Sequence, residues 1–213
     1  MKMKNRIQAG EMLSKLLHNY ENSAALVLAI PRGGVIVGSQ IAKLLNLSLE
    51  LIITKKISHP QDENVAIGAI AQDGNPVFIS RDTSQIEMKW LNEQVRNSRE
   101  EIAHRHELYH KNNQPLNIED KEILLVTDGI LSGLSVMAAI EECQRLRARS
   151  IVVVTPSISI DAALAIQPMV KKLVSLTVEE TLKATVDEYY EDEQEITDET
   201  VIAVLEEFAG AKQ

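Results

Sequence analysis

One stretch of the chain decides the fold: Glu122-Ile123-Leu124-Leu125-Val126-Thr127-Asp128-Gly129-Ile130-Leu131-Ser132-Gly133-Leu134-Ser135-Val136. An apolar run ends in a Thr-Asp pair, passes through a short Gly/Ser loop and enters a segment with helical periodicity. This order predicts a buried strand that leads through a polar loop into a helix. The first N–H groups of a helix have no partner within it, and its dipole favours negative charge there. Gly133 lets the backbone approach a phosphate, and Ser132 and Ser135 can donate hydroxyl hydrogen bonds. The stretch therefore predicts a site for a phosphorylated sugar, with Asp128 placed to accept hydrogen bonds from sugar hydroxyls.

Apolar runs alternate with helical patterns on both sides of this stretch. We expect strands at 24–30, 47–54, 122–127, 150–155 and 172–177, and helices at 7–19, 35–45, 134–147 and 160–168, with a last helix capped by Thr197 or Asp198. This alternation predicts an α/β fold, a doubly wound, mostly parallel sheet with helices on both faces. Ligands of such sheets bind in the loops at the carboxyl ends of the strands, here 31–34, 54–60 and 127–135.

Two segments lie outside the alternation. Residues 65–70 and 77–79, joined by a turn at Asp73-Gly74, predict a small hairpin. Residues 83–112 predict a long charged helix with a thin apolar stripe of Leu91, Val95 and Ile102, lying on the surface or against a partner chain, which is compatible with a homodimer. We expect a single domain over 1–213, with a core at about 22–58 and 120–178 and a hood at about 1–20, 60–118 and 179–213.

Composition narrows the function classes. The 213 residues carry a net charge of −9, which argues against a nucleic-acid partner or an anionic membrane surface. No apolar run approaches the about 20 residues that span a bilayer. Cys143 is the single cysteine, and its helical spacing with apolar neighbours predicts a core position rather than a nucleophile. A cytoplasmic protein is expected.

Two further segments, each at the end of a strand, provide positive side chains or a backbone that an anion can approach closely. Pro31-Arg32-Gly33-Gly34 follows the first strand, where a guanidinium suits phosphate oxygens and two glycines let backbone N–H groups face an anion. Lys55-Lys56, with His59, forms a positive spot in an acidic chain. Each segment also fits a purely structural interpretation without a ligand. The first would then be a turn that enters a helix, and the second a solvated loop.

Two other patterns are weaker. His106-Glu107-Leu108-Tyr109-His110 matches the zinc-protease pattern of two histidines one helical turn apart, but a five-residue match arises often by chance. A solvated helix face is the simpler interpretation. The acidic run 187–199 reads as a solvated connection, in which Tyr189 and Tyr190 could instead cover the site.

Taken together, these motifs resemble the type I phosphoribosyltransferases, and more closely a bacterial phosphoribosyltransferase-domain branch. The matching pieces, in chain order, are Arg6-x-x-Ala9-Gly10, Pro31-Arg32-Gly33-Gly34-Val35, Lys55-Lys56-Ile57 leading to Pro60, Ala66-Ile67-Gly68-Ala69, Asp128-Gly129-Ile130-Leu131-Ser132-Gly133, and Thr197-Asp198-Glu199 with Val201. The similarity covers most of the chain, and the central loop is its most specific piece.

The resemblance implies a site for phosphoribosyl pyrophosphate (PRPP) with Mg²⁺. The 5′-phosphate would lie on the loop from Gly129 to the helix start, bound by Ser132, Gly133, Leu134 and Ser135. Asp128, with Thr127 beside it, would hold the ribose and the metal. Arg32, Gly33 and Gly34 would bind the pyrophosphate, whose charge Lys55 and Lys56 would neutralise. The implied reaction transfers phosphoribose to an unknown acceptor resembling a nitrogenous base, with Asp128, Arg32 and Lys56 as its key side chains.

Two residues depart from the family pattern. Thr127 replaces the first of two adjacent acids, which removes a charge-assisted contact of about 1.5–3 kcal/mol, or roughly ten- to hundredfold in affinity. Leu131 stands where purine-salvage members carry an aspartate base, which argues against that chemistry. A non-catalytic regulator that binds PRPP or a nucleotide therefore stays an alternative, and a zinc hydrolase at 106–110 a remote one.

Overall fold

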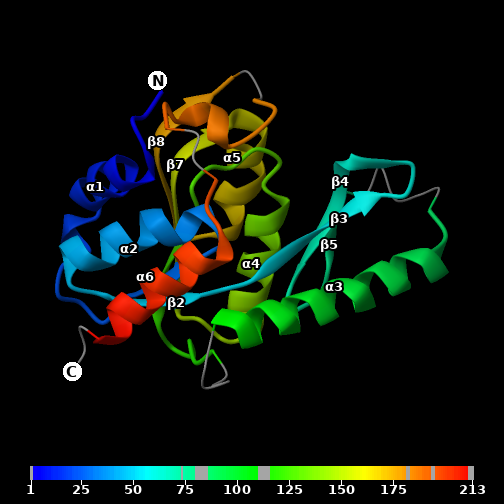
Figure 1. Cartoon of the computed structure of the whole chain (residues 1–213), viewed down its shortest axis with the longest axis horizontal. Coiled ribbons are helices and arrows are strands. Elements are labelled where there is room, and N and C mark those ends of the chain that lie inside the picture. The colour runs from blue at the N-terminus through cyan, green and yellow to red at the C-terminus, as the bar shows by residue number, and fades with distance from the viewer. Residues whose placement is uncertain are drawn as a thin grey trace.

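A five-stranded parallel sheet forms the centre of the protein in the computed structural model (Figure 1). The structure describes residues 2–72, 74–79, 86–109, 116–180, 183–192 and 195–210, without the side chains of 64, 209 and 210. The sheet order is β2-β1-β6-β7-β8, with β1 at Leu26–Ala29, β2 at Ser48–Leu51, β6 at Glu122–Val126, β7 at Ser150–Ser159 and β8 at Lys172–Glu179. The expectation of a doubly wound, parallel α/β fold is confirmed.

Helices cover both faces of this sheet because alternate strand residues point to opposite sides. Val27 and Val126 belong to the core on the face covered by α1 (Arg6–Leu16), α2 (Gly33–Leu45) and α6 (Asp198–Gly210). Leu28 and Leu125 belong to the core on the other face, under α4 (Leu134–Arg145) and α5 (Ile160–Ile166). Cys143 lies in this second core with no exposed surface, and burial raises the pKa of its thiol to about 12, which confirms the core prediction. Short 3₁₀ helices complete the described elements, at His18–Tyr20, Gln167–Met169 and Asp187–Tyr189.

A second, antiparallel sheet extends from the core beside a long helix (Figure 1). It has the order β3-β4-β5, with β3 at Thr54–His59, β4 at Asp62–Ala71 and β5 at Val77–Phe78. From here on, the hood means only this sheet and α3 (Met88–Tyr109), a smaller set of residues than the hood expected from the sequence. Ile57, Ile67 and Leu91 join the two parts of the hood in one apolar cluster. Within the described residues no helix is long and apolar enough to cross a membrane.

The segment that leads from β2 through the hood differs from the sequence prediction in two places. The predicted strand over 47–54 ends at Leu51, and the predicted loop over 54–60 forms β3. The cause is pairing with β4, the next strand along the chain, in an antiparallel hairpin that also buries Ile57. The helix predicted from residue 83 begins at Met88 in the described part of the chain, while residues 73, 80–85 and 110–115 lie outside it.

The long helix is fixed to the rest of the chain by its C-terminal turns. Ile102 is buried as predicted, and so are Ser98 and Tyr109, which the predicted stripe did not include. The Tyr109 hydroxyl donates a hydrogen bond of 2.5 Å to the Asp198 carboxylate at the start of α6. Burial, followed by the contact with Asp198, raises the pKa of Tyr109. The end of α3 is therefore held against the core.

Replacing Tyr109 with phenylalanine tests this attachment. A buried hydrogen bond to a charged group contributes about 1.5–3 kcal/mol, and the partial exposure of Asp198 lowers this value. We expect the free energy of unfolding to fall by about 1 kcal/mol and the Tm by about 2–4 °C in thermal unfolding. Tyr20→Phe is the control and should have a smaller effect, because the Tyr20 hydroxyl lies 3.5 Å from Glu122. Equal Tm values for wild type and Tyr109→Phe would contradict this assignment.

Candidate functional site

The strand order places a crevice between β1 and β6. From β1 the chain passes through α2 to β2 on one side, and from β6 it passes through α4 to β7 on the other. The loops after these two strands therefore diverge, and ligands of doubly wound sheets bind at such a point. A cleft of about 400 Å³ lies here. Its lining residues come from the β1 end, from the loop after β6 with the start of α4, from the hood and from the C-terminal region: Ile30, Pro31, Thr54, Lys55, Lys56, Ser58, Arg105, Thr127, Asp128, Gly129, Ile130, Leu131, Ser132, Gly133, Leu134, Ser135, Val136 and Val186.

The N-terminus of α4 opens into this cleft. Gly133 precedes the helix with a φ of 78°, a left-handed conformation that a residue with a side chain rarely adopts. No side chain caps the helix, so the Ser132 hydroxyl does not accept a hydrogen bond from its first N–H groups. The first N–H groups of α4 are left for another acceptor, and Ser132 and Ser135 line the cleft beside them. Free N–H groups at the start of a helix are favourable partners for an anion.

The two glycines after Pro31 make room for close packing. A Cβ atom on Gly33 would lie 1.8 Å from Oδ2 of Asp128, and one on Gly34 would lie 2.9 Å from the carbonyl oxygen of Val126. The Pro31–Arg32 peptide bond is cis. These contacts bring the start of α2 directly against the end of β6.

The Arg32 side chain does not line the cleft. Its guanidinium lies 3.5 Å from the Glu195 carboxylate, and 39% of the side chain is exposed. The structure thus brings together Lys55, Lys56 and the 127–135 loop as predicted, but not the Arg32 guanidinium. A pyrophosphate role for Arg32 stays a prediction.

Asp128 is the centre of a polar cluster at the floor of the cleft. Arg6 Nε donates a hydrogen bond of 2.8 Å to Asp128 Oδ2, and Arg6 Nη2 donates one of 2.5 Å to Asp187. The Tyr190 hydroxyl donates to the Asp128 carbonyl oxygen at 2.5 Å, and the Arg6 guanidinium lies 4.6 Å from the Tyr190 ring centroid. The Arg6 and Asp128 side chains are 8% and 15% exposed. We call these four residues the Asp128 cluster.

Burial governs the electrostatics of the Asp128 cluster. It raises the pKa of the Asp128 carboxyl above its ordinary value, and the charge of Arg6 opposes that rise. Burial alone would lower the pKa of Arg6, but the two carboxylates outweigh it and raise that pKa. Burial, and then the neighbouring Asp128, also raise the pKa of Tyr190. Arg6 therefore supplies the positive charge that lets Asp128 be buried as a carboxylate.

Sequence reasoning gave no role to Arg6 or to a second arginine, Arg105. Arg6 stood in a motif near the N-terminus, but its contact with Asp128 spans 122 positions and no local pattern reveals it. Arg105 is one of many charged residues on α3, and it lines the cleft with Lys55 and Lys56. Tyr190 contacts the Asp128 carbonyl oxygen, but neither Tyr189 nor Tyr190 lines the cleft, so a covering role for them stays a prediction.

The zinc pattern receives no support from the described residues. His106 and Glu107 line a different cleft of about 370 Å³ between α3 and α4, and His110 lies outside the described residues. No group of three His, Cys, Asp or Glu side chains in the described ranges could hold a metal ion.

A protein family, a curated protein and a solved structure are similar to this chain. A family model described as the phosphoribosyl transferase domain matches residues 3–193. A curated protein of Mycobacterium tuberculosis, named "Putative phosphoribosyl transferase" in both strains CDC 1551 and H37Rv, is 26% identical over 205 residues, which cover 95% of this chain and 46% of that protein. The chain thus spans about half the length of the curated relatives that it matches. The crystal structure of TT1426 from Thermus thermophilus is 28% identical, with a TM-score of 0.81 over 98% of this chain and 99% of that one.

Replacing Arg6 with glutamine tests the Asp128 cluster. Removing one partner of a buried ion pair costs about 3–5 kcal/mol, because the other charge stays buried. Without Arg6 the pKa of Asp128 rises further. A carboxyl whose pKa is higher in the folded than in the unfolded state favours folding at low pH, and that contribution is lost as pH rises through the folded-state value. We therefore expect the loss of unfolding free energy to be larger at pH 7 than near pH 4, measured by denaturant titration.

The matched control is the same substitution in an Asp128→Asn background, where no buried carboxylate remains. There the cost of Arg6→Gln should be smaller and nearly independent of pH. In the protein that keeps Asp128, Arg6→Gln should lower the free energy of unfolding by different amounts at pH 4 and pH 7. Equal losses at the two pH values would contradict this account of the Arg6–Asp128 pair.

Proposed function

Since the chain belongs to the phosphoribosyl transferase domain family and has the type I phosphoribosyltransferase fold, we propose that it binds PRPP in the cleft between β1 and β6. It transfers the phosphoribosyl group to an acceptor resembling a nitrogenous base and releases pyrophosphate. The observation that carries this proposal is the uncapped N-terminus of α4, which opens into a cleft with basic side chains on another wall.

The 5′-phosphate fits the α4 end of the cleft. Its oxygens would accept hydrogen bonds from the backbone N–H groups of Ser132, Gly133, Leu134 and Ser135 and from the two serine hydroxyls. Gly129 belongs to the same loop, and a Cβ atom there would lie 2.7 Å from Val186 Cγ1, so the glycine lets the loop pack closely against Val186. The ribose would lie over Thr127 and Asp128, which line the floor.

The pyrophosphate fits the side of the cleft where Lys55 and Lys56 lie. Displacement at the anomeric carbon passes through a cation-like transition state, and the leaving pyrophosphate gains charge. Positioning and electrostatic stabilisation supply the catalysis, so a nucleophilic side chain is not required. The backbone of Gly33 and Gly34 borders the same floor through its contacts with Asp128 and β6.

Magnesium fits this site as part of the substrate rather than as a resident ion. Asp128 is the single carboxylate among the described residues that line the cleft, and its Oδ2 atom already accepts from Arg6. Mg²⁺ commonly keeps several waters and binds through substrate phosphates with one or two carboxylates. We propose that Mg²⁺ enters on the phosphates of PRPP, with Asp128 as its nearest protein carboxylate.

A non-catalytic PRPP- or nucleotide-binding regulator is the second candidate. Two observations favour it: Thr127 offers a hydroxyl where the family pattern has an acid, and Asp128 is engaged by Arg6. The two candidates share the binding site and differ in turnover. Mg²⁺-dependent release of pyrophosphate from PRPP across a panel of nitrogenous bases supports the enzyme, and binding without any release supports the regulator.

Thermal unfolding with increasing PRPP, with and without Mg²⁺, tests the binding site. A ligand that binds only the folded state raises the Tm as its concentration rises. We expect such a rise for the wild type, and an apparent affinity at least about tenfold weaker when Ser132 and Ser135 are both replaced by alanine. His106→Ala, in the other cleft, should match the wild type. A wild-type Tm that does not change up to millimolar PRPP would rule out both candidates.

Replacing Thr127 with aspartate restores the first of the two adjacent acids of the family pattern. If the Thr127 side chain faces the ribose, the new carboxylate accepts a hydrogen bond from a ribose hydroxyl and tightens PRPP binding by roughly ten- to hundredfold. Thr127→Val, which removes the hydroxyl at similar volume, is the matched control and should weaken binding. Unchanged affinity in both variants, measured by calorimetric titration, would mean that residue 127 does not contact the sugar.

A further inference from the structure

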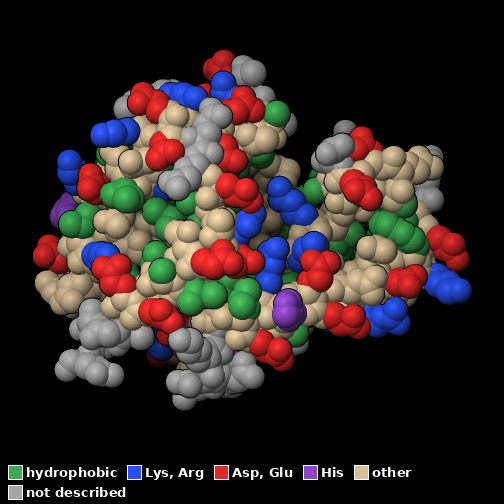
Figure 2. All heavy atoms as spheres, viewed as in Figure 1, with side chains coloured by type: hydrophobic (Ala, Val, Ile, Leu, Met, Phe, Trp, Pro, Cys, Tyr) green, Lys and Arg blue, Asp and Glu red, His purple; other side chains and the backbone are tan. Residues whose placement is uncertain are grey.

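The described residues that line the cleft carry more positive than negative charge. Four charged side chains among the described lining residues are Lys55, Lys56, Arg105 and Asp128. Asp128 pairs with Arg6, and Lys55 Nζ lies 2.5 Å from the Glu101 carboxylate of α3. Neither Lys56 nor Arg105 forms an ion pair within the described part of the chain. Figure 2 shows basic side chains gathered in the hollow between the core and the hood, on a protein whose net charge is −9.

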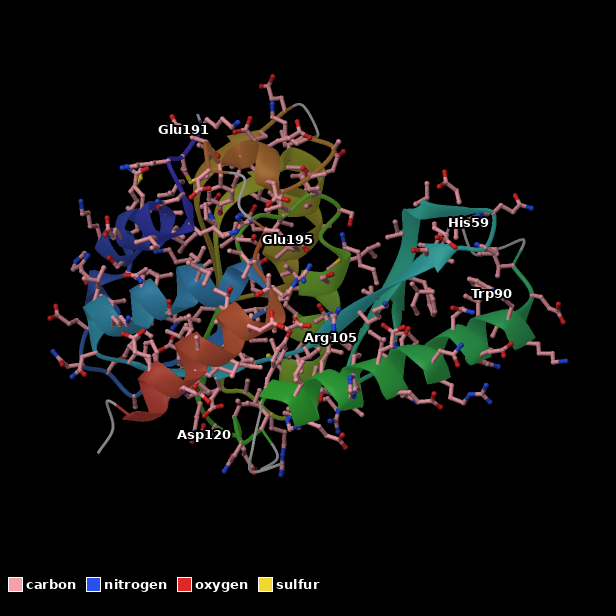
Figure 3. The ribbon with its side chains drawn as sticks, viewed as in Figure 1. His59, Trp90, Arg105, Asp120, Glu191 and Glu195 are labelled. Carbon is pink, nitrogen blue, oxygen red and sulfur yellow. The ribbon has the colours of Figure 1, made fainter. Side chains whose placement is uncertain are left out.

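Arg105 is held at this wall by its helix. It stands four residues after Glu101, so both side chains emerge from the same face of α3, the face that meets Lys55. Ile102 and Tyr109 on either side of it are buried, and Tyr109 bonds to Asp198. Figure 3 places Arg105 on the part of α3 that passes closest to the core. Groups carried on braced helices are positioned more accurately than groups on loops.

The arrangement separates two kinds of anion site in one cleft. One is the α4 N-terminus, built from backbone N–H groups and serine hydroxyls, and the other is the wall that carries Lys56 and Arg105. Arg32, the arginine expected to bind pyrophosphate, points instead to Glu195 and does not line the cleft. A guanidinium presents a planar set of donors that matches two phosphate oxygens at once.

We propose that Arg105, together with Lys56, forms the subsite for the pyrophosphate end of the ligand, while the α4 N-terminus holds the 5′-phosphate. This inference rests on the proposed function and adds a binding residue to it. As the bond between the anomeric carbon and the pyrophosphate oxygen breaks, its electron pair stays on that oxygen. Arg105 stabilises the charge gained there, while the acceptor nitrogen bonds to the carbon and its proton passes to solvent.

Calorimetric titration with three ligands, each with and without Mg²⁺, tests the proposal. The ligands are pyrophosphate, ribose 5-phosphate and PRPP, and the proteins are the wild type, Arg105→Ala and Arg96→Ala. Arg96 is the matched control, because it lies on the same helix, is 67% exposed and does not line the cleft. We expect Arg105→Ala to weaken pyrophosphate and PRPP binding by about ten- to hundredfold and to leave ribose 5-phosphate unchanged. Arg96→Ala should match the wild type for all three ligands.

The outcomes separate this inference from the proposed function. Equal pyrophosphate affinities for Arg105→Ala and Arg96→Ala overturn the Arg105 subsite. The subsite is also overturned if Arg32→Ala loses pyrophosphate affinity while Arg105→Ala keeps it. If the wild type binds pyrophosphate but neither ribose 5-phosphate nor PRPP, and Arg105→Ala loses that pyrophosphate affinity, the result supports the subsite and rejects the proposed function. Thermal unfolding of each variant checks that it is folded. Arg105→Lys keeps the charge without the planar donors and should recover part of the pyrophosphate affinity.

Discussion

The contact between Arg6 and Asp128 joins parts of the chain that are far apart in sequence. Arg6 begins α1, Asp128 follows β6, and Oδ2 of Asp128 lies where a side chain on Gly33 would have to be. Asp187 and Tyr190 complete the contact from the C-terminal region. Because a buried carboxylate without a cation is costly, the loop after β6 can enter the cleft in this form only while α1 is in place. The position of the cleft floor therefore depends on this ion pair.

The cleft combines this neutralised floor with two separate sources of positive potential. The α4 N-terminus contributes partial charge from backbone N–H groups, and the hood contributes whole charges from Lys56 and Arg105. A ligand with a phosphate at each end would contact both and bridge the core and the hood. The hood thus forms one wall of the cleft, and α3 places one of these charges, Arg105, on it.

Much of this architecture could be predicted from the sequence, because it depends on local patterns. Buried parallel strands are continuous apolar runs, so β1 and β6 stand out, and the Gly/Ser loop after β6 predicted the open start of α4. The features that were missed depend on contacts that no single segment displays. β3 has one apolar residue, Ile57, and is a strand because β4, the next strand along the chain, pairs with it. Arg6 matters because Asp128, which lies 122 positions away, accepts its hydrogen bond. Arg105 could not be distinguished from the other charged residues of α3, since the rotation of that helix is decided by the burial of Ser98, Ile102 and Tyr109.

The central claim is that the start of α4 holds the phosphate of a phosphoribosyl ligand. A crystal structure of the protein grown with ribose 5-phosphate tests it most directly. The account predicts a phosphate within hydrogen-bond distance of the backbone nitrogens of residues 132–135, with the ribose over Asp128. A ribose 5-phosphate bound elsewhere, with no phosphate at the start of α4, would contradict it.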